Sequence, residues 1–359
     1  MRILQQLKLA CYSAIFMTSQ TAYAQDMSSL ANEVLEISGA PAASIGVMRD
    51  GNMRVASAGA IYRNGPAVTD ESLWHIGSNT KSMTATLIAR LAERGVIRWE
   101  DAIADVLGPV LSDIDQGYRA VTYADLLHHR AGLPANPGRL SMIRMSGSAA
   151  ERDVPADRLS AAAAALAQAP RAQGSFQYSN LGYIVAGAML EQQTGLPWET
   201  LITRHVFSPL GMDSAGFGAP GVSTPETQPW GHRKFLFVRR AISPGPAGDN
   251  PPFFGPAGTV HLSIPDHLTY LNAHATQDTT FLTPESWRRL HDPPEGADYS
   301  AGWGHRQGVL AHAGSNTMWY SFVAFDPQTR TSAVINVNSG DRARAEAAIA
   351  AVVAKLFQP

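Results

Sequence analysis

The chain has 359 residues, of which 45% are hydrophobic and 16% charged, and its formal net charge is −2. The near balance of charge offers no basic field of the kind that binds nucleic acid. This length and apolar content are sufficient for a large hydrophobic core in one or two domains.

The first 24 residues predict a secretory signal peptide. Arg2 and Lys8 precede a mostly apolar stretch over 9–17, and the sequence Ala-Tyr-Ala at 22–24 resembles a cleavage site. The apolar stretch is shorter than the roughly 20 residues that span a bilayer, and no later segment comes closer. We therefore expect a periplasmic or secreted protein without a membrane span.

Cys11 is the only cysteine, and it lies within the expected leader. Lys8 stands three residues before it, where a lipid-attachment motif has an aliphatic residue, so we expect no lipid anchor. Removal of the leader would leave a mature chain without thiols. Disulfides, cysteine nucleophiles and thiolate metal sites would then be excluded.

Hydrophobic periodicity predicts that both ends of the chain contribute to one antiparallel sheet. A helix over 27–37 precedes alternating apolar segments at 43–49 and 54–62, joined by Asp-Gly-Asn at 50–52, which is typical of a hairpin. Three apolar segments and an alanine-rich helix follow near the C-terminus, at 308–313, 318–325, 332–337 and 342–356.

The middle of the chain predicts a mainly helical region. Its helical patterns lie at 79–94, 123–129, 181–193, 198–205 and 264–274. We expect an α/β fold of the α+β kind. Its sheet domain, flanked by the terminal helices, would take residues 25–77 and 291–359, and an inserted all-helical domain would take 78–290. The glycine- and proline-rich stretch 216–258 predicts an irregular loop.

Ser78-Asn79-Thr80-Lys81 forms an S-x-x-K element at the start of a predicted helix. Spacing of three residues places the Ser78 hydroxyl and the Lys81 amine on one helix face. A serine hydroxyl needs a base, and lysine can serve when desolvation lowers its pKa. Taken alone, the element is equally consistent with an N-capping serine and a solvated lysine.

Two further elements lie at structural transitions. Tyr178-Ser179-Asn180 precedes a predicted helix, and His312-Ala313-Gly314 ends an apolar run. Tyr178 could carry a proton, Asn180 could hold a substrate amide carbonyl, and Gly314 at a strand edge would let a substrate backbone approach. Taken singly, Tyr178 and Asn180 could be a turn and an N-cap, and His312 a core histidine.

The three elements stand in the order, and within the surroundings, of the serine β-lactamase-related superfamily, which this chain resembles. That superfamily includes class C β-lactamases, DD-peptidases, D-aminopeptidases and esterases of the same fold. The resemblance extends over nearly the whole mature chain and is carried by segments 72–78, 126–134 (LLHHRAGLP), 177–187 (QYSNLGYIVAG), 207–212, 255–262 and 302–304.

The resemblance implies an active site in the cleft between a sheet domain and a helical domain. It assigns Ser78 as the nucleophile, Lys81 as its base partner and Tyr178 as the proton carrier. Asn180 and His312 would contact the substrate, and the backbone N–H groups of Ser78 and Ser315 would form the oxyanion hole. No cofactor or metal is implied.

The third element departs from class C β-lactamases, which have a lysine where this chain has His312. Histidine there is more similar to DD-peptidases, D-aminopeptidases and some esterases. Because an unperturbed histidine titrates near pH 6.5, we expect carboxylate binding at His312 to strengthen as the pH falls through that value.

Other patterns are weak. Residues 216–221 match G-x-G-x-x-G by letter, but no strand precedes them and Pro220 disfavours the required helix. His128 and His129 are adjacent on a predicted helix and point in different directions, so we expect a structural role for them. No G-x-S-x-G elbow is present.

The sequence therefore predicts a serine hydrolase that forms an acyl-enzyme on a peptide amide, a small ester or a β-lactam, with DD-peptidase or esterase activity favoured. A β-lactamase and a catalytically silent binding protein of the same fold remain as alternatives, because fold does not determine substrate. The physiological substrate and the oligomeric state are left open.

Overall fold

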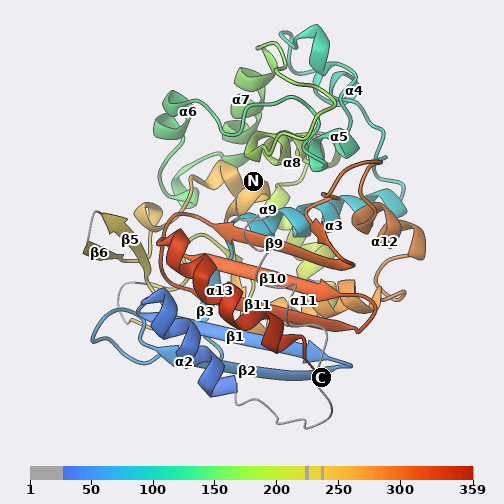
Figure 1. The fold of residues 1–359 in the computed structure, drawn as a ribbon. Coiled ribbons are helices and arrows are strands. Elements are labelled where there is room, and N and C mark those ends of the chain that lie inside the picture. The colour runs from blue at the N-terminus through green and yellow to red at the C-terminus, as the bar shows by residue number, and fades with distance from the viewer. Residues whose placement is uncertain (1–26, 223–225, 236–237, 359) are drawn as a thin grey trace.

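The computed structural model describes residues 27–222, 226–235 and 238–358. The predicted leader at 1–24, with Cys11, lies outside these residues. Figure 1 shows a twisted sheet with helices on its faces and a helical region beside one edge. Within the described ranges, no helix has the length and apolarity needed to cross a membrane.

The main sheet has six strands in the order β2-β1-β11-β10-β9-β8, with every neighbouring pair antiparallel. Its strands are β1 Ala42–Arg49, β2 Asn52–Gly59, β8 Gly304–Arg306, β9 Val309–Ser315, β10 Tyr320–Asp326 and β11 Thr331–Val337. Pairing of β1 with β11 joins the two ends of the chain, as the sequence predicts. The antiparallel sheet is confirmed.

The hairpin between β1 and β2 is also confirmed. Arg49 pairs with Asn52 across the turn, and the two residues between them, Asp50 and Gly51, have φ values of 48° and 78°. A two-residue turn with both central φ values positive matches the twist of the flanking strands, and Asp-Gly suits it.

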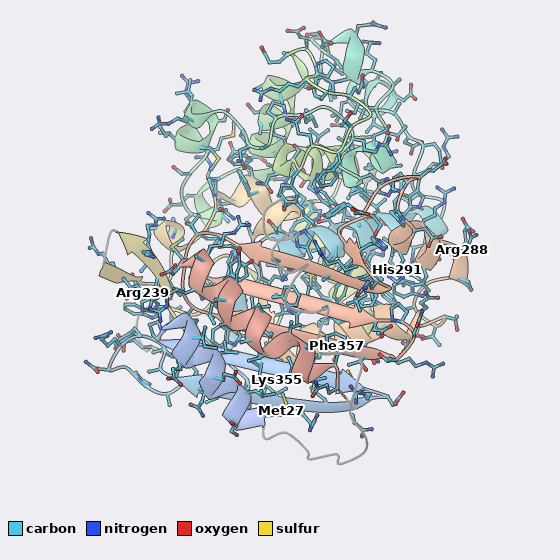
Figure 2. All side chains as sticks on the ribbon, in the orientation of Figure 1. Met27, Arg239, Arg288, His291, Lys355 and Phe357 are labelled. Carbon is cyan, nitrogen blue, oxygen red and sulfur yellow. The ribbon has the colours of Figure 1, made fainter. Side chains whose placement is uncertain are left out.

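Helices cover both faces of the sheet. On one face lie α2 (Met27–Ser38) and α13 (Arg342–Leu356), which share a hydrophobic core with β1, β10 and β11. Figure 2 shows Lys355 beside α2, where its Nζ lies 2.7 Å from a Glu33 carboxylate oxygen. On the other face lies α11 (Ile264–Thr276). The predicted boundary at 290 thus separates α11 from the sheet on which it packs.

The remaining helices lie in the middle of the chain, where the sequence predicts a mainly helical region, although only four of them coincide with the predicted patterns at 79–94, 123–129, 181–193 and 198–205. They are α3 Thr80–Glu93, α4 Ile103–Leu107, α5 Tyr123–Leu127, α6 Arg139–Arg144, α7 Val154–Leu166, α8 Asn180–Thr194, α9 Trp198–Ile202, α10 Gly255–Gly258 and α12 Pro284–His291. A π-helical segment, η4 Thr203–Phe207, continues α9. Short 3₁₀ turns are η1 Gly77–Asn79, η2 Gln116–Tyr118, η3 Ala149–Glu151, η5 Ser208–Leu210, η6 Pro246–Gly248 and η7 Pro252–Phe254.

The stretch 216–258 is more ordered than predicted. It contains β4 (Gly216–Phe217) and the hairpin of β5 (Gly231–Phe235) with β6 (Val238–Ile242). The basic residues in both hairpin strands leave no apolar alternation, which is why periodicity misses them. β4 joins β3 (Leu73–His75) and β7 (Val260–Ser263) in a small sheet. This second sheet leads directly into the turn that carries Ser78.

Candidate active site

Ser78 lies on the turn η1, between the end of β3 and the start of α3. Gly77 before it has a φ of +52°, in the left-handed region, and a Cβ at this position would lie 2.4 Å from the Ser315 nitrogen. Only glycine fits this turn. The N-cap position of α3 is Asn79, without a side-chain capping bond, so the Ser78 hydroxyl is not used as a helix cap.

Lys81 is fully buried, which excludes its interpretation as a solvated helix residue. Its Nζ lies 3.1 Å from Ser78 Oγ, 2.6 Å from Asn180 Oδ1 and 2.7 Å from the Ala257 carbonyl oxygen. Asn180 Oδ1 and the Ala257 carbonyl can only accept hydrogen bonds, so each takes one N–H of the amine. The third position on the nitrogen therefore faces Ser78.

Burial lowers the pKa of Lys81 well below its usual value, because desolvation disfavours the ammonium form. In the neutral amine, the position that faces Ser78 is a lone pair. That lone pair can take the hydroxyl proton of Ser78 while the two fixed acceptors keep the nitrogen in place. The arrangement suits a general base.

Tyr178 lies next to both groups. Its ring centroid is 5.0 Å from Lys81 Nζ, and its burial raises the pKa of the phenol well above its usual value, opposed by a hydrogen bond with Ser78. The phenol therefore keeps its proton near neutral pH. Tyr178 can donate or relay a proton, but it is a poor candidate for the phenolate base.

His129 holds the Tyr178 segment in place. The two rings lie 4.5 Å apart, and His129 Nδ1 accepts a hydrogen bond of 3.1 Å from the Ser179 backbone N–H. Burial lowers the pKa of His129 well below its usual value, so the ring is neutral. His129 thus has a structural role, as predicted, and this role is to hold the segment that contains Tyr178.

Asn180 begins α8, and the N-cap of that helix is Ser179, whose Oγ accepts from the Gly182 N–H at 3.1 Å. Its side chain is bound at both ends: Oδ1 accepts from Lys81, and Nδ2 donates to Asn136 Oδ1 at 2.7 Å. For Asn180 to hold a substrate carbonyl, Nδ2 must leave Asn136. Asn136 follows the LLHHRAGLP segment, and the sequence carries no separate signal for it.

Strand β9 brings the third element to the nucleophile. Its residues alternate in burial, which places His312 and Gly314 on the buried face. A Cβ at Gly314 would lie 1.9 Å from the Ile76 carbonyl oxygen and 2.8 Å from the Ser78 nitrogen. Glycine is thus required by the close approach of β9 to the nucleophile turn, and the expected approach of a substrate backbone to Gly314 stays a prediction.

His312 is neutral in this site. Its Nδ1 lies 3.1 Å from Asn79 Oδ1, and the Asn79 amide is oriented by a 2.9 Å bond from Nδ2 to Ser321 Oγ. Nδ1 therefore carries the ring proton and Nε2 is an acceptor. Burial, assisted by Lys81, lowers the pKa of His312 to about 3. The expectation of titration near pH 6.5 is therefore wrong for the free site.

The structure brings all the predicted site residues together around the first turn of α3. Ser78, Lys81 and Asn180 are joined by hydrogen bonds, and the Tyr178 and His312 rings lie 6.4 Å apart. Ser315 contacts Gly77 and donates its hydroxyl to the Trp319 carbonyl at 2.7 Å. In the described part of the chain, no group of three or more metal-ligating side chains is found.

Comparison with known proteins places the chain in a family. The chain is 25% identical over 339 residues to "Penicillin-binding protein 4" of Amycolatopsis lactamdurans, covering 84% of this chain and 81% of that protein. Its fold is similar to a D-amino acid amidase from Ochrobactrum anthropi SV3, with a TM-score of 0.72, 19% identity and coverage of 92% and 98%. A β-lactamase from Sulfitobacter sp. EE-36 gives a TM-score of 0.71, 19% identity and coverage of 93% and 100%.

Residues 27–356 match the family model described as Beta-lactamase, which spans both the sheet and the helical region. The chain belongs to the β-lactamase family of serine hydrolases.

Proposed function

We propose that this protein is a serine hydrolase that forms an acyl-enzyme at Ser78, with Lys81 as general base. The observation that supports it most is the placement of Lys81, whose buried amine has two fixed acceptors and directs its remaining position at Ser78 Oγ, 3.1 Å away. A buried amine is costly in free energy. Lys81 has no evident structural purpose that would offset this cost.

The proposed reaction begins when Ser78 Oγ bonds to the substrate carbonyl carbon and its proton passes to Lys81. The carbonyl oxygen becomes an anion, which would accept from the N–H groups of Ser78 and Ser315. Such donors each contribute about 3 kcal/mol to transition-state stabilisation. The bond to the leaving group then breaks, and that group takes a proton from Lys81 by way of Tyr178. In a second round of the same steps, a water molecule takes the place of Ser78 as the nucleophile and Ser78 becomes the leaving group.

We propose a neutral amide or small ester as the substrate class, in preference to a β-lactam. His312 supports this choice, because it is neutral and presents an acceptor, Nε2, where a lysine would present a fixed cation. An acceptor repels a carboxylate and can receive a substrate N–H or O–H. A peptide substrate that must be recognised by its free carboxylate is disfavoured for the same reason.

A substrate panel tests this proposal. We would compare kcat/KM for p-nitrophenyl acetate and butyrate, D-alanyl amides and peptides, and nitrocefin at pH 7.5. Ester or amide turnover should exceed β-lactam turnover by a wide margin. Efficient nitrocefin hydrolysis that outpaces the esters would assign the protein as a β-lactamase, and no turnover of any substrate would support a silent binding protein.

Replacing His312 by lysine should change this preference. We expect His312→Lys to lower KM for nitrocefin at pH 8 by about tenfold, since a charge-assisted bond adds about 1.5 kcal/mol to a carboxylate contact. Between pH 5.5 and 8.5, titration of His312 should cause no change in the wild-type KM for nitrocefin, because the His312 pKa of about 3 lies below that range. A nitrocefin KM that falls on acidification through pH 6.5 in the wild type only would show that His312 does titrate there.

We also propose that the protein is periplasmic or secreted. This rests on the leader pattern over residues 1–24 alone. Mass spectrometry of protein recovered from the periplasmic fraction should give an N-terminus near Gln25. A species that retains Cys11 with an added lipid mass would instead identify an anchored lipoprotein.

A further inference from the structure

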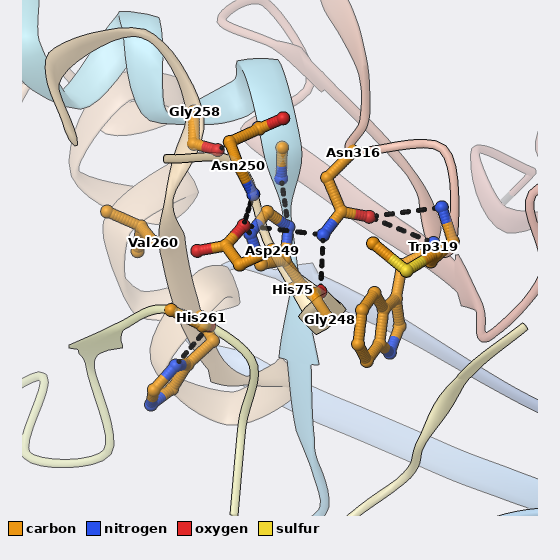
Figure 3. A network of polar contacts seen from close by, with 12 residues as sticks. His75, Gly248, Asp249, Asn250, Gly258, Val260, His261, Asn316 and Trp319 are labelled. Carbon is orange, nitrogen blue, oxygen red and sulfur yellow. Dashed lines mark hydrogen bonds and ion pairs between the residues drawn. The ribbon is translucent and has the colours of Figure 1, made fainter. Parts of the chain in front are cut away.

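A buried polar network lies beside the nucleophile turn (Figure 3). Its centre is His75, at the end of β3, whose Nδ1 accepts a 3.1 Å hydrogen bond from the Gly77 backbone N–H. His75 Nε2 lies 2.5 Å from Asp249 Oδ1. The two side chains are only 0% and 7% exposed, so this contact is shielded from water.

The contacts of His75 determine its tautomer. Because Nδ1 accepts from Gly77, it carries no proton, and the ring proton must lie on Nε2, toward Asp249. The Nε2 contact is short but is not aligned as a hydrogen bond. Its attraction is therefore mainly electrostatic, and a carboxylate beside Nε2–H makes Nδ1 a stronger acceptor for the Gly77 N–H.

Asp249 is itself held by two donors. Its Oδ1 accepts from the Asn250 backbone N–H at 2.6 Å and from Asn316 Nδ2 at 3.4 Å. Asn316 follows Ser315 and also binds the Gly248 carbonyl at 3.1 Å. Asp249 thus connects the turn that carries Ser78 with the turn that follows β9.

The network also reaches the segment that holds Lys81. Asn250 Nδ2 donates to the Gly258 carbonyl at 2.9 Å, and a Cβ at Gly258 would lie 3.6 Å from the Ser78 nitrogen. Ala257, beside it, accepts from Lys81. The network therefore joins the three backbone segments that meet at the Ser78 and Ser315 N–H groups.

The glycine at the centre of these contacts needs such a support. Gly77 has a φ of +52°, and the peptide that follows it contains the Ser78 N–H. Its own N–H is the group that His75 binds. Loss of this bond frees a glycine, which has many accessible conformations, at the position that sets the direction of the Ser78 N–H.

We propose that His75 and Asp249 are a positioning pair for the oxyanion hole: they hold the Gly77–Ser78 peptide, and through Asn316 the Ser315 turn, in the geometry that stabilises the transition state. Neither residue contacts the substrate. The proposal rests on the proposed acyl-enzyme function. Displacement of an oxyanion donor by about 1 Å is sufficient for a loss of about 10²-fold in rate.

Two substitutions of His75 separate its two contacts. His75→Asn keeps an acceptor oxygen near the place of Nδ1 and loses the reach to Asp249. His75→Gln keeps the reach to Asp249 and loses the acceptor for Gly77. The matched control is His261→Asn, because His261 lies opposite His75 in the β3–β7 register but donates its Nδ1–H to the Gly218 carbonyl instead.

The readouts are kcat and KM for p-nitrophenyl acetate, and the inhibition constant of phenylboronic acid, whose serine adduct places an oxygen in the oxyanion hole. We expect His75→Gln to lower kcat and boronate affinity together by about 10- to 100-fold, with KM changed less than threefold. His75→Asn and Asp249→Asn should lose less than His75→Gln, and His261→Asn should match the wild type.

Equal kcat and boronate affinity in His75→Gln and wild type would overturn the proposal, and so would a rise in KM alone. If His75→Gln does not fold, the decision rests on Asp249→Asn against Asp249→Ala: the alanine variant should lose kcat and boronate affinity in parallel, and unchanged values in it would overturn the proposal. A wild type that neither turns over esters nor binds the boronate would instead contradict the acyl-enzyme function itself.

Discussion

Ser78→Ala is expected to lower kcat/KM for p-nitrophenyl acetate by at least about 10³-fold, because the nucleophile of an acyl-enzyme mechanism has no substitute. The free energy of unfolding should change by less than about 0.5 kcal/mol, the usual size for a residue without a cap or core role. Ser78 makes no capping bond to α3, which is the structural reason for this second expectation. Steady-state kinetics and urea denaturation measure the two effects.

The matched control is Ser263→Ala. Ser263 does cap a helix, because its Oγ accepts from the Asp266 N–H at 3.3 Å at the start of α11. Loss of this capping bond should lower the free energy of unfolding by about 1 kcal/mol and leave kcat/KM near the wild-type value. Activity of Ser78→Ala above a tenth of the wild-type value would show that Ser78 is not the nucleophile.

Lys81→Ala and Lys81→Arg should both lower kcat/KM by about 10³-fold or more, as expected when a nucleophile loses its base. Arginine does not rescue activity because its guanidinium keeps its proton at every accessible pH. Small primary alkylamines should restore part of the activity of Lys81→Ala, since they can enter the space left beside Asn180 and Ala257. They should not restore Ser78→Ala.

The pH dependence of the wild type follows from the same amine. The pKa of Lys81 is lowered well below its usual value by desolvation, and the neutral form is the base. Activity should therefore rise with pH through one ionisation that lies well below 10.5, and the amine rescue of Lys81→Ala should follow the pKa of the added amine. Activity in Lys81→Arg close to wild type would mean that Lys81 only positions Ser78 by its charge.

The sequence is sufficient to predict those parts of the fold that depend on local pattern. Alternation and an Asp-Gly turn predict β1 and β2, and the elements at both chain ends follow from apolar runs. The hairpin of β5 and β6 is missed because its strands are rich in charge. The placement of α11 under the sheet is missed because a helical pattern does not say which surface the helix will cover.

The candidate site is likewise only partly predictable from the sequence. Ser78 and Lys81 are predictable from spacing, since a helix places residues three apart on one face. The contacts that tune them are not, because Asn136 and Ala257 approach from distant parts of the chain, and His75 depends on a contact with Asp249, which is equally distant in sequence. The neutral state of His312 also depends on the tertiary structure, because burial and the nearby Lys81 lower its pKa.

The central claim is that Ser78 is the residue that becomes acylated, and covalent labelling tests it most directly. The wild type, Ser78→Ala and Lys81→Ala would be treated with a fluorophosphonate, digested and mapped by mass spectrometry. We predict one phosphonyl adduct on the peptide that contains Ser78, a matching loss of esterase activity, no adduct in Ser78→Ala and much slower labelling in Lys81→Ala. Inactivation with the adduct on a different residue, or continued ester hydrolysis by a protein that never becomes labelled, would contradict the account.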